Sequence, residues 1–177
     1  MKKINNVFGI IILVSLVIFI NIIIGYYSKE IIYKNKVNRI ISGMIKNRYS
    51  NIDNEYNGYI YFYKNNKKLL IKKGNYNKVL NDNDVLLYSD YNSFNSLRGE
   101  VVLLGHNNHL VFGFLHHITK GDVFMISSLS TSKKYIVDDI RVINQNDMDL
   151  IKTNNQIILV TCTDNDTKRL IIYARQL

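Results

Sequence analysis

The only cysteine of this chain, Cys162, stands where an apolar run ends. The last residues read ILVTCTDNDTKRLIIYARQL (158–177), so a short polar patch and Arg169 separate this run from a second one. If the two runs pair as an antiparallel hairpin centred between residues 165 and 166, Cys162 lies directly opposite Arg169. Opposed residues share a face, with Cβ atoms about 4.5–5.5 Å apart; an odd-length loop or a bulge would shift this register.

A cysteine beside a cation is suited to nucleophilic chemistry. The thiolate is the reactive form, and a nearby positive charge favours it. An arginine stays charged and can donate hydrogen bonds to a developing oxyanion. The hairpin therefore predicts Cys162 as a nucleophile and Arg169 as its electrostatic partner.

Such a nucleophile also needs a group that takes and returns a proton, which is usually histidine. His106 ends the apolar run VVLLGH and opens the polar loop GHNNH, and site residues often lie on a loop held by a rigid strand. We therefore expect His106 to be the partner of Cys162. We expect His109 to be a surface loop residue. His116 and His117 fall in a short helical stretch, where one should face solvent and the other should pack.

Each of these residues also has a plainer explanation. Cys162 would serve equally as a small buried hydrophobe, and Arg169 as a surface strand charge in a weak ion pair. The histidines and the cysteine could ligate a metal, but no zinc spacing motif appears, so we expect no metal. No Cys-Gly-x-Cys-Trp-type stretch surrounds Cys162, which argues against a papain-like protease.

Eight short runs rich in β-branched and aromatic residues must position these groups. Clusters of Asn, Asp, Gly and Ser separate them, as is typical of turns. The runs cover 59–63, 69–72, 84–89, 100–106, 122–127, 133–143, 156–162 and 169–175. Many short strands at roughly regular spacing predict a mainly β domain, either a barrel or a sandwich. Residues 112–119 predict one or two helical turns.

An uncharged stretch, VFGIIILVSLVIFINIII, covers residues 7–24. As a helix it would be about 27 Å long, close to the ~30 Å hydrocarbon core of a membrane. A cleaved signal peptide is the alternative, but only Gly25 and Ser28 supply small residues near a cleavage site. We therefore expect a short cytoplasmic tail, an uncleaved transmembrane anchor, a stalk or N-terminal helix and one domain, at 1–6, 7–27, 28–55 and 56–177.

The chain is basic, with a formal net charge of +9. A basic surface could meet nucleic acid, anionic lipid or an anionic wall polymer, and charge alone does not choose among them. A single cysteine excludes an internal disulfide framework. Lys and Arg are more numerous after the apolar stretch than before it, which favours a cytoplasmic domain, although long domains translocate regardless of such counts.

The order of these motifs resembles that of the sortases, the membrane-anchored cysteine transpeptidases of Gram-positive bacteria. LVTC (159–162) resembles the family's Thr-Leu-x-Thr-Cys signature, with Ile158 at the first threonine, and Arg169 resembles the arginine of the following strand. VVLLGH (101–106) resembles the strand that ends in Gly-His. FGFLHHITKGD (112–122) resembles the Phe-x-x-Leu segment that ends in Gly-Asp, and 57–74 resembles the opening strands.

The resemblance covers residues 57–177 and has departures. Sortase opening strands usually carry prolines, and this chain has none. The short loop between Cys162 and Arg169 resembles the compact classes. The loop GHNN is similar to class B, but the long helical insertion before the class B cysteine is absent. We therefore expect a compact class D-like or class B-like enzyme.

What the resemblance implies is a closed β-barrel of about eight strands with short helices, held outside the cell membrane by a single N-terminal transmembrane helix. Cys162 would attack the Thr–Gly carbonyl of a Leu-Pro-x-Thr-Gly-like (LPxTG-like) sorting motif and form a thioacyl-enzyme. His106 would protonate the leaving amine and deprotonate the incoming one. Arg169 would steady the oxyanion or position the substrate, and Thr161 would border the pocket as a substrate-binding residue.

The partners implied are proteins with a sorting signal and an amino acceptor on a cell-wall precursor or a pilin, with no nucleic acid and no cofactor. No carboxylate cluster argues for the calcium that some family members bind. Two alternatives stay open. One is a membrane-tethered, non-catalytic binding module on a sortase-like barrel, with an inert thiol. The other is a hydrolase that uses water as the acceptor.

Overall fold

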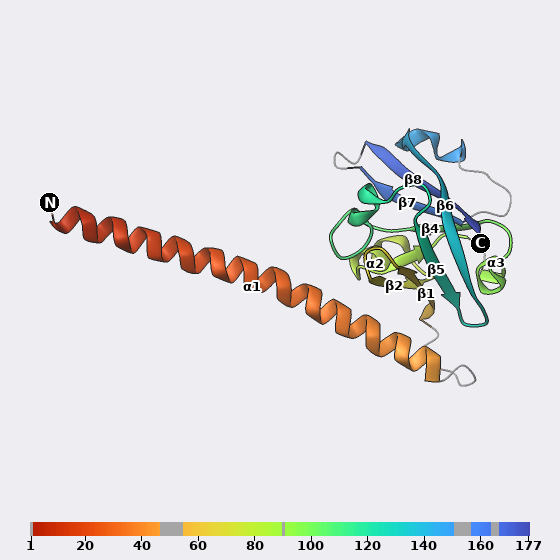
Figure 1. Cartoon of the computed structure of the whole chain (residues 1–177), viewed down its shortest axis with the longest axis horizontal. Coiled ribbons are helices and arrows are strands. Elements are labelled where there is room, and N and C mark those ends of the chain that lie inside the picture. The colour runs from red at the N-terminus through yellow and green to blue at the C-terminus, as the bar shows by residue number, and fades with distance from the viewer. Residues whose placement is uncertain (1, 47–54, 90, 151–156, 164–166) are drawn as a thin grey trace. The chain divides into compact units, whose positions relative to one another are not determined.

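The computed structural model describes residues 2–46, 55–89, 91–150, 157–163 and 167–177 (Figure 1). The chain divides into two compact units, with the boundary between Lys36 and Val37. Each unit is considered by itself.

A single helix, α1 (Lys2–Lys46), makes up the first unit and continues into the second. Its segment Ile10–Lys46 is a candidate membrane span by length and composition, and the apolar side chains of residues 10–24 are exposed. The helix runs without a break through the expected boundary between anchor and stalk at residue 27. Val37 and Ile41 are buried within the second unit, and residues 47–54 of the expected stalk lie outside the described residues.

The second unit contains a closed barrel of eight strands in the order β1-β2-β3-β4-β7-β8-β6-β5. The strands are β1 (Tyr56–Phe62), β2 (Lys67–Lys72), β3 (Val85–Leu87), β4 (Val101–Leu104), β5 (Val123–Ser128), β6 (Ser132–Asn144), β7 (Ile157–Cys162) and β8 (Lys168–Gln176). Each of the eight predicted runs forms a strand, so the mainly β prediction is confirmed. The barrel is mixed, because β2 pairs with β3, and β4 with β7, in parallel.

In the described residues, four short helical elements connect the strands: α2 (Tyr76–Asn81), α3 (Tyr91–Ser96) and the 3-10 helices η1 (Gly113–His117) and η2 (Gln145–Leu150). Only η1 was expected from the sequence. Asn75 caps the start of α2, since its side chain accepts a hydrogen bond from the backbone N–H of Lys78 at 3.2 Å. That capping pattern is readable in the sequence, but a six-residue helix has too few turns to show an apolar periodicity.

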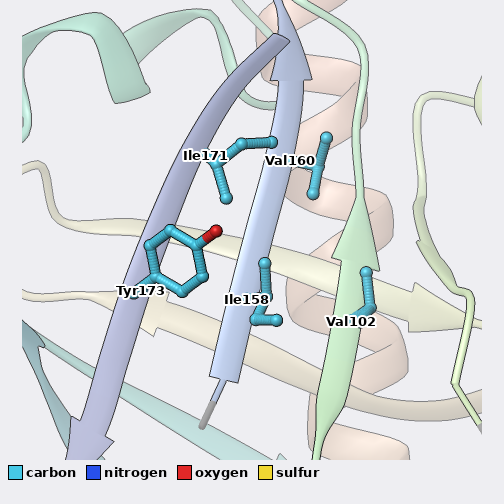
Figure 2. Close-up of a cluster of buried hydrophobic side chains, with 5 residues drawn as sticks. All are labelled: Val102, Ile158, Val160, Ile171 and Tyr173. Carbon is cyan, nitrogen blue, oxygen red and sulfur yellow. The ribbon is translucent and has the colours of Figure 1, made fainter. Parts of the chain in front are cut away.

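Two layers of apolar side chains lie on the two faces of the barrel wall. On the inner face, Phe62 packs against Phe112 and Phe124 with ring centroids 6.4 and 5.3 Å away. On the outer face of β4, β7 and β8, Figure 2 shows a second cluster, formed by Val102, Ile158, Val160, Ile171 and Tyr173. Because side chains alternate along a strand, this outer face also carries Cys162 and Arg169.

Candidate active site

Cys162 and Arg169 are directly opposed residues in the β7–β8 pairing. The ladder continues one step past them, since the Thr163 N–H donates to the Lys168 carbonyl at 3.1 Å. The predicted register is therefore confirmed, although residues 164–166 lie outside the described residues. β7 is paired on both sides, with β4 and β8, so Cys162 stands at the end of an interior strand of the barrel.

His106 reaches the same place from the neighbouring parallel strand. In the β4–β7 register, Leu104 is level with Val160. Gly105 extends this pairing because its N–H donates to the Val160 carbonyl at 3.1 Å. Its own carbonyl accepts a hydrogen bond from the buried Thr161 hydroxyl at 2.9 Å. Two hydrogen bonds thus fix the backbone of Gly105 to β7. The next residue, His106, comes level with Cys162.

The loop after His106 is held by its own hydrogen bonds. The His106 carbonyl accepts from the Phe112 N–H at 3.0 Å. The Asn108 side-chain oxygen accepts from the N–H groups of Leu110 and Val111, both at 3.0 Å, and its amide nitrogen donates to the Asn83 side chain at 3.0 Å. Short loops fixed in this way place a side chain reproducibly, which a proton-transfer group requires.

Gly105 is a position where the backbone tolerates no side chain. A Cβ added there would lie 2.7 Å from Cγ of the Phe112 ring. Phe112 is fully buried, so the ring has little room to give way. The close approach explains why glycine precedes His106.

Arg169 is a half-buried residue, and two acceptors orient its guanidinium. Nη1 donates to the Lys168 carbonyl, and Nη2 donates to Oε1 of Gln145, each at 3.1 Å. Gln145 is itself tied to the hairpin, since its N–H donates to the Thr167 carbonyl at 3.2 Å. The first residue of η2 therefore holds the arginine beside the strand end that carries Cys162.

These side chains open into one pocket of about 480 Å³. It brings together all four residues singled out in the sequence, Thr161, Cys162, His106 and Arg169. Its apolar lining comes from the outer face of the barrel and from α2, and the rest of its lining is mostly polar. The apolar residues are Leu80, Val102, Leu104 and Val160, and the others are Tyr76, Tyr88, Glu100, Gly105 and Gln145.

The other histidines lie elsewhere. His109 is exposed, as expected. The expectation that one of His116 and His117 packs inward is wrong, because both are exposed. In a 3-10 helix residues three apart share a face, and Leu115 and Ile118 occupy the buried face instead.

A thiol, an imidazole and a guanidinium from three different elements thus line one pocket. Nucleophilic acyl transfer needs such a set: a nucleophile, a proton carrier and a donor for a developing negative charge. Of the His, Cys, Asp and Glu side chains in the described part of the chain, no three come together as a metal site requires.

The chain matches one protein family and several solved structures. The profile of the Sortase domain matches residues 62–177, and no curated protein matches the chain. Sortase C1 from Streptococcus agalactiae is 28% identical, with a TM-score of 0.61 over 72% of this chain and 70% of that chain. The pilus-related sortase C of Group B Streptococcus is 27% identical, with a TM-score of 0.60 over 71% and 69%. Sortase C from Clostridium perfringens SM101 shares the fold at 22% identity, with a TM-score of 0.59 over 85% and 98%.

Proposed function

This chain belongs to the sortase family, and from that premise we propose that it is a cysteine transpeptidase that cleaves an LPxTG-like sorting motif between Thr and Gly. The proposal rests above all on one observation: Cys162, His106 and Arg169 line a single pocket. The thioacyl-enzyme formed at Cys162 would pass its acyl group to an amino acceptor.

In the first half-reaction, the Cys162 sulfur attacks the threonine carbonyl and the carbonyl electrons move onto oxygen. Arg169 donates hydrogen bonds to that oxyanion. The C–N bond to glycine breaks as protonated His106 gives its proton to the departing amine. The product is a thioester on Cys162 and a free peptide that begins with glycine.

In the second half-reaction, an incoming amine attacks the thioester while neutral His106 takes its proton. The C–S bond breaks, the amide forms and the thiolate returns to Cys162. Thr161 contributes by its hydrogen bond to the Gly105 carbonyl, which keeps the ends of β4 and β7 in register. No cofactor enters these steps.

We propose an amino group of a cell-wall precursor or of a pilin subunit as the acceptor. The pilus-related relative supports the second of these. Because such acceptors are outside the cell, the barrel would be extracytoplasmic and α1 would be a single-pass anchor in the cell membrane. The Lys/Arg count around the apolar stretch favours the opposite orientation, so the orientation rests on the chemistry.

The first test is acylation of the full chain in detergent with an LPxTG-type peptide library, followed by mass spectrometry. We expect an adduct on Cys162 that has lost the residues after threonine. It should be absent in Cys162→Ala, strongly reduced in His106→Ala and retained in His109→Ala, whose histidine is exposed and outside the pocket.

Two further arms separate the alternatives. Addition of an amine should convert the adduct into an amide product, whereas a hydrolase would release the free acid whether or not amine is present. A folded protein whose Cys162 reacts with neither peptide nor a small alkylating reagent would overturn the proposal in favour of a binding module.

A further inference from the structure

The pocket has a second charged group far from the reacting thiol. Glu100 lines the pocket and directly precedes β4. In the parallel β4–β7 register, Leu104 is level with Val160, two residues before Cys162. Glu100 therefore stands about six residues short of the level of Cys162, which at ~3.3 Å per residue is roughly 20 Å along the strands.

Apolar side chains separate the two ends. Val102 and Leu104 on β4 and Val160 on β7 line the pocket between Glu100 and the catalytic residues. Arg169 lies at one end and Glu100 at the other, so the pocket has opposite charges at its ends. A chain bound along this surface would meet this negative charge only well away from its scissile bond.

Two exposed tyrosines, Tyr76 and Tyr88, line the same pocket as Glu100. Tyr88 donates its N–H to the Val102 carbonyl at 3.0 Å and so extends the β3–β4 pairing. Glu100 is then its diagonal neighbour across the strands, about 7–8 Å away. Tyr76 reaches the pocket from α2, and the rings of Tyr76 and Tyr88 are 53% and 70% exposed.

The negative charge of Glu100 acts on the outer face of the barrel. Burial raises the pKa of Tyr173, the Arg141 guanidinium opposes the rise, and the carboxylates of Asp139 and Glu100 add to it. Tyr173 belongs to the cluster in Figure 2 that continues into the floor of the pocket through Val102 and Val160.

A carboxylate with exposed aromatic rings is the set that recognises an ammonium or guanidinium group. We propose that Glu100, with Tyr76 and Tyr88, binds a lysine or arginine side chain of the acyl-donor polypeptide. This rests on the proposed function of the pocket. An extended donor chain rises about 3.3 Å per residue. With the N-terminal side of the donor towards Glu100, as this proposal has it, the cation lies about five or six residues before the cleaved bond, just ahead of the sorting motif.

The attacking amine of the acceptor is not the group that Glu100 binds. That amine must come within bonding distance of the acyl carbon on Cys162, and the register puts Glu100 roughly 20 Å away along the strands. The proposal therefore assigns Glu100 to binding of the donor, and the aminolysis step should not depend on it.

The test measures peptide binding to the full-length Cys162→Ala protein in detergent by fluorescence anisotropy. The peptides carry an LPxTG motif, with Lys, Gln or Glu placed in turn at each of the positions ahead of it. We expect Lys to bind about three- to tenfold tighter than Gln at one or two adjacent positions, as a partly exposed charge pair with a cation–π contact allows. Glu100→Gln should bring this ratio to about one, and Glu100→Lys should make the Glu peptide the preferred one.

The matched control is Asp138→Asn, which removes a carboxylate that pairs with Arg175 and does not line the pocket; it should keep the lysine preference. With Cys162 intact, the same ratio should appear in KM and not in kcat. A lysine preference that survives in Glu100→Gln, or that follows the acceptor and not the donor, would overturn the proposal.

Failure of the two proposals is distinguishable. Charge-dependent binding without acylation of Cys162 would support the role of Glu100 and contradict the transpeptidase function. Acylation with equal use of Lys and Gln peptides would do the reverse, and no binding of any peptide would overturn both.

Discussion

Replacement of Gly105 by alanine tests whether backbone packing positions His106. The new Cβ would lie 2.7 Å from Cγ of Phe112, whereas ordinary contact begins at 3.4 Å. The ring is fully buried, so most of the missing distance must come from movement of the backbone beside His106. Overpacking of this kind costs about 1–3 kcal/mol in the free energy of unfolding.

The same movement should impair catalysis more than stability. A catalytic group displaced by about 1 Å can cost on the order of 100-fold in rate, and the required shift is most of that distance. We therefore expect Gly105→Ala to lower kcat/KM for sorting-peptide cleavage by roughly 10- to 100-fold, while the protein remains folded at room temperature.

The assay pairs steady-state kinetics on the full chain with chemical denaturation. Gly43→Ala is the control, because an added Cβ at Gly43 in α1 meets nothing within 4 Å; it should leave both readouts near those of the wild type. If Gly105→Ala has the kcat/KM and the denaturation midpoint of the wild type, the reasoning is refuted. The close approach of Gly105 to Phe112 would then not be what positions His106.

Three further predictions concern single side chains. Thr161→Val leaves the Gly105 carbonyl without its hydroxyl donor and should cost about 1–3 kcal/mol in denaturation, whereas Thr161→Ser should retain most of the stability; equal losses would contradict this role of the hydroxyl. Arg169→Lys should lower kcat about 10²–10³-fold if the arginine stabilises the oxyanion. Arg175→Lys, on the same strand, should not, and equal effects would argue against the assignment. Burial raises the pKa of Tyr135 to about 12, and its buried hydroxyl has no hydrogen-bond partner among the described residues. The unfolded tyrosine ionises near pH 10, so stability present below pH 10 should be lost as the pH rises towards 12. The free energy of unfolding, measured by denaturation, should therefore fall less between pH 8 and pH 11 in Tyr135→Phe than in the wild type. An equal fall in the two proteins would contradict the prediction.

Much of the barrel could be predicted from the sequence because strand formation leaves a local trace. All eight predicted runs form strands, since β-branched and aromatic residues alternate between polar turns. The pairing of Cys162 with Arg169 was also predictable, because a hairpin register depends only on the residues between the two strands. The membrane-length part of α1 was predictable from the uncharged apolar stretch at residues 7–24.

Other features were not visible in the sequence because they depend on contacts between distant segments. The parallel pairing of β4 with β7 joins residues more than fifty positions apart, and no local pattern specifies it. The placement of His106 level with Cys162 follows from that pairing. The prediction that one of His116 and His117 packs inward was wrong for a different reason. A 3-10 helix repeats every three residues, and the apolar side chains of Leu115 and Ile118 occupy its buried face.

Local sequence patterns thus specified the strands and the hairpin that sets Cys162 opposite Arg169, and they supplied the residue types that the proposed acyl transfer needs. The sequence also pointed to His106 as the partner of the thiol, but the folded barrel was needed to bring His106 level with Cys162 and to show which other side chains complete the pocket. Gln145 and Glu100 reach that pocket from η2 and from the start of β4. Neither position carries a sequence signal, because closure of the barrel, and not local propensity, brings these segments to one face.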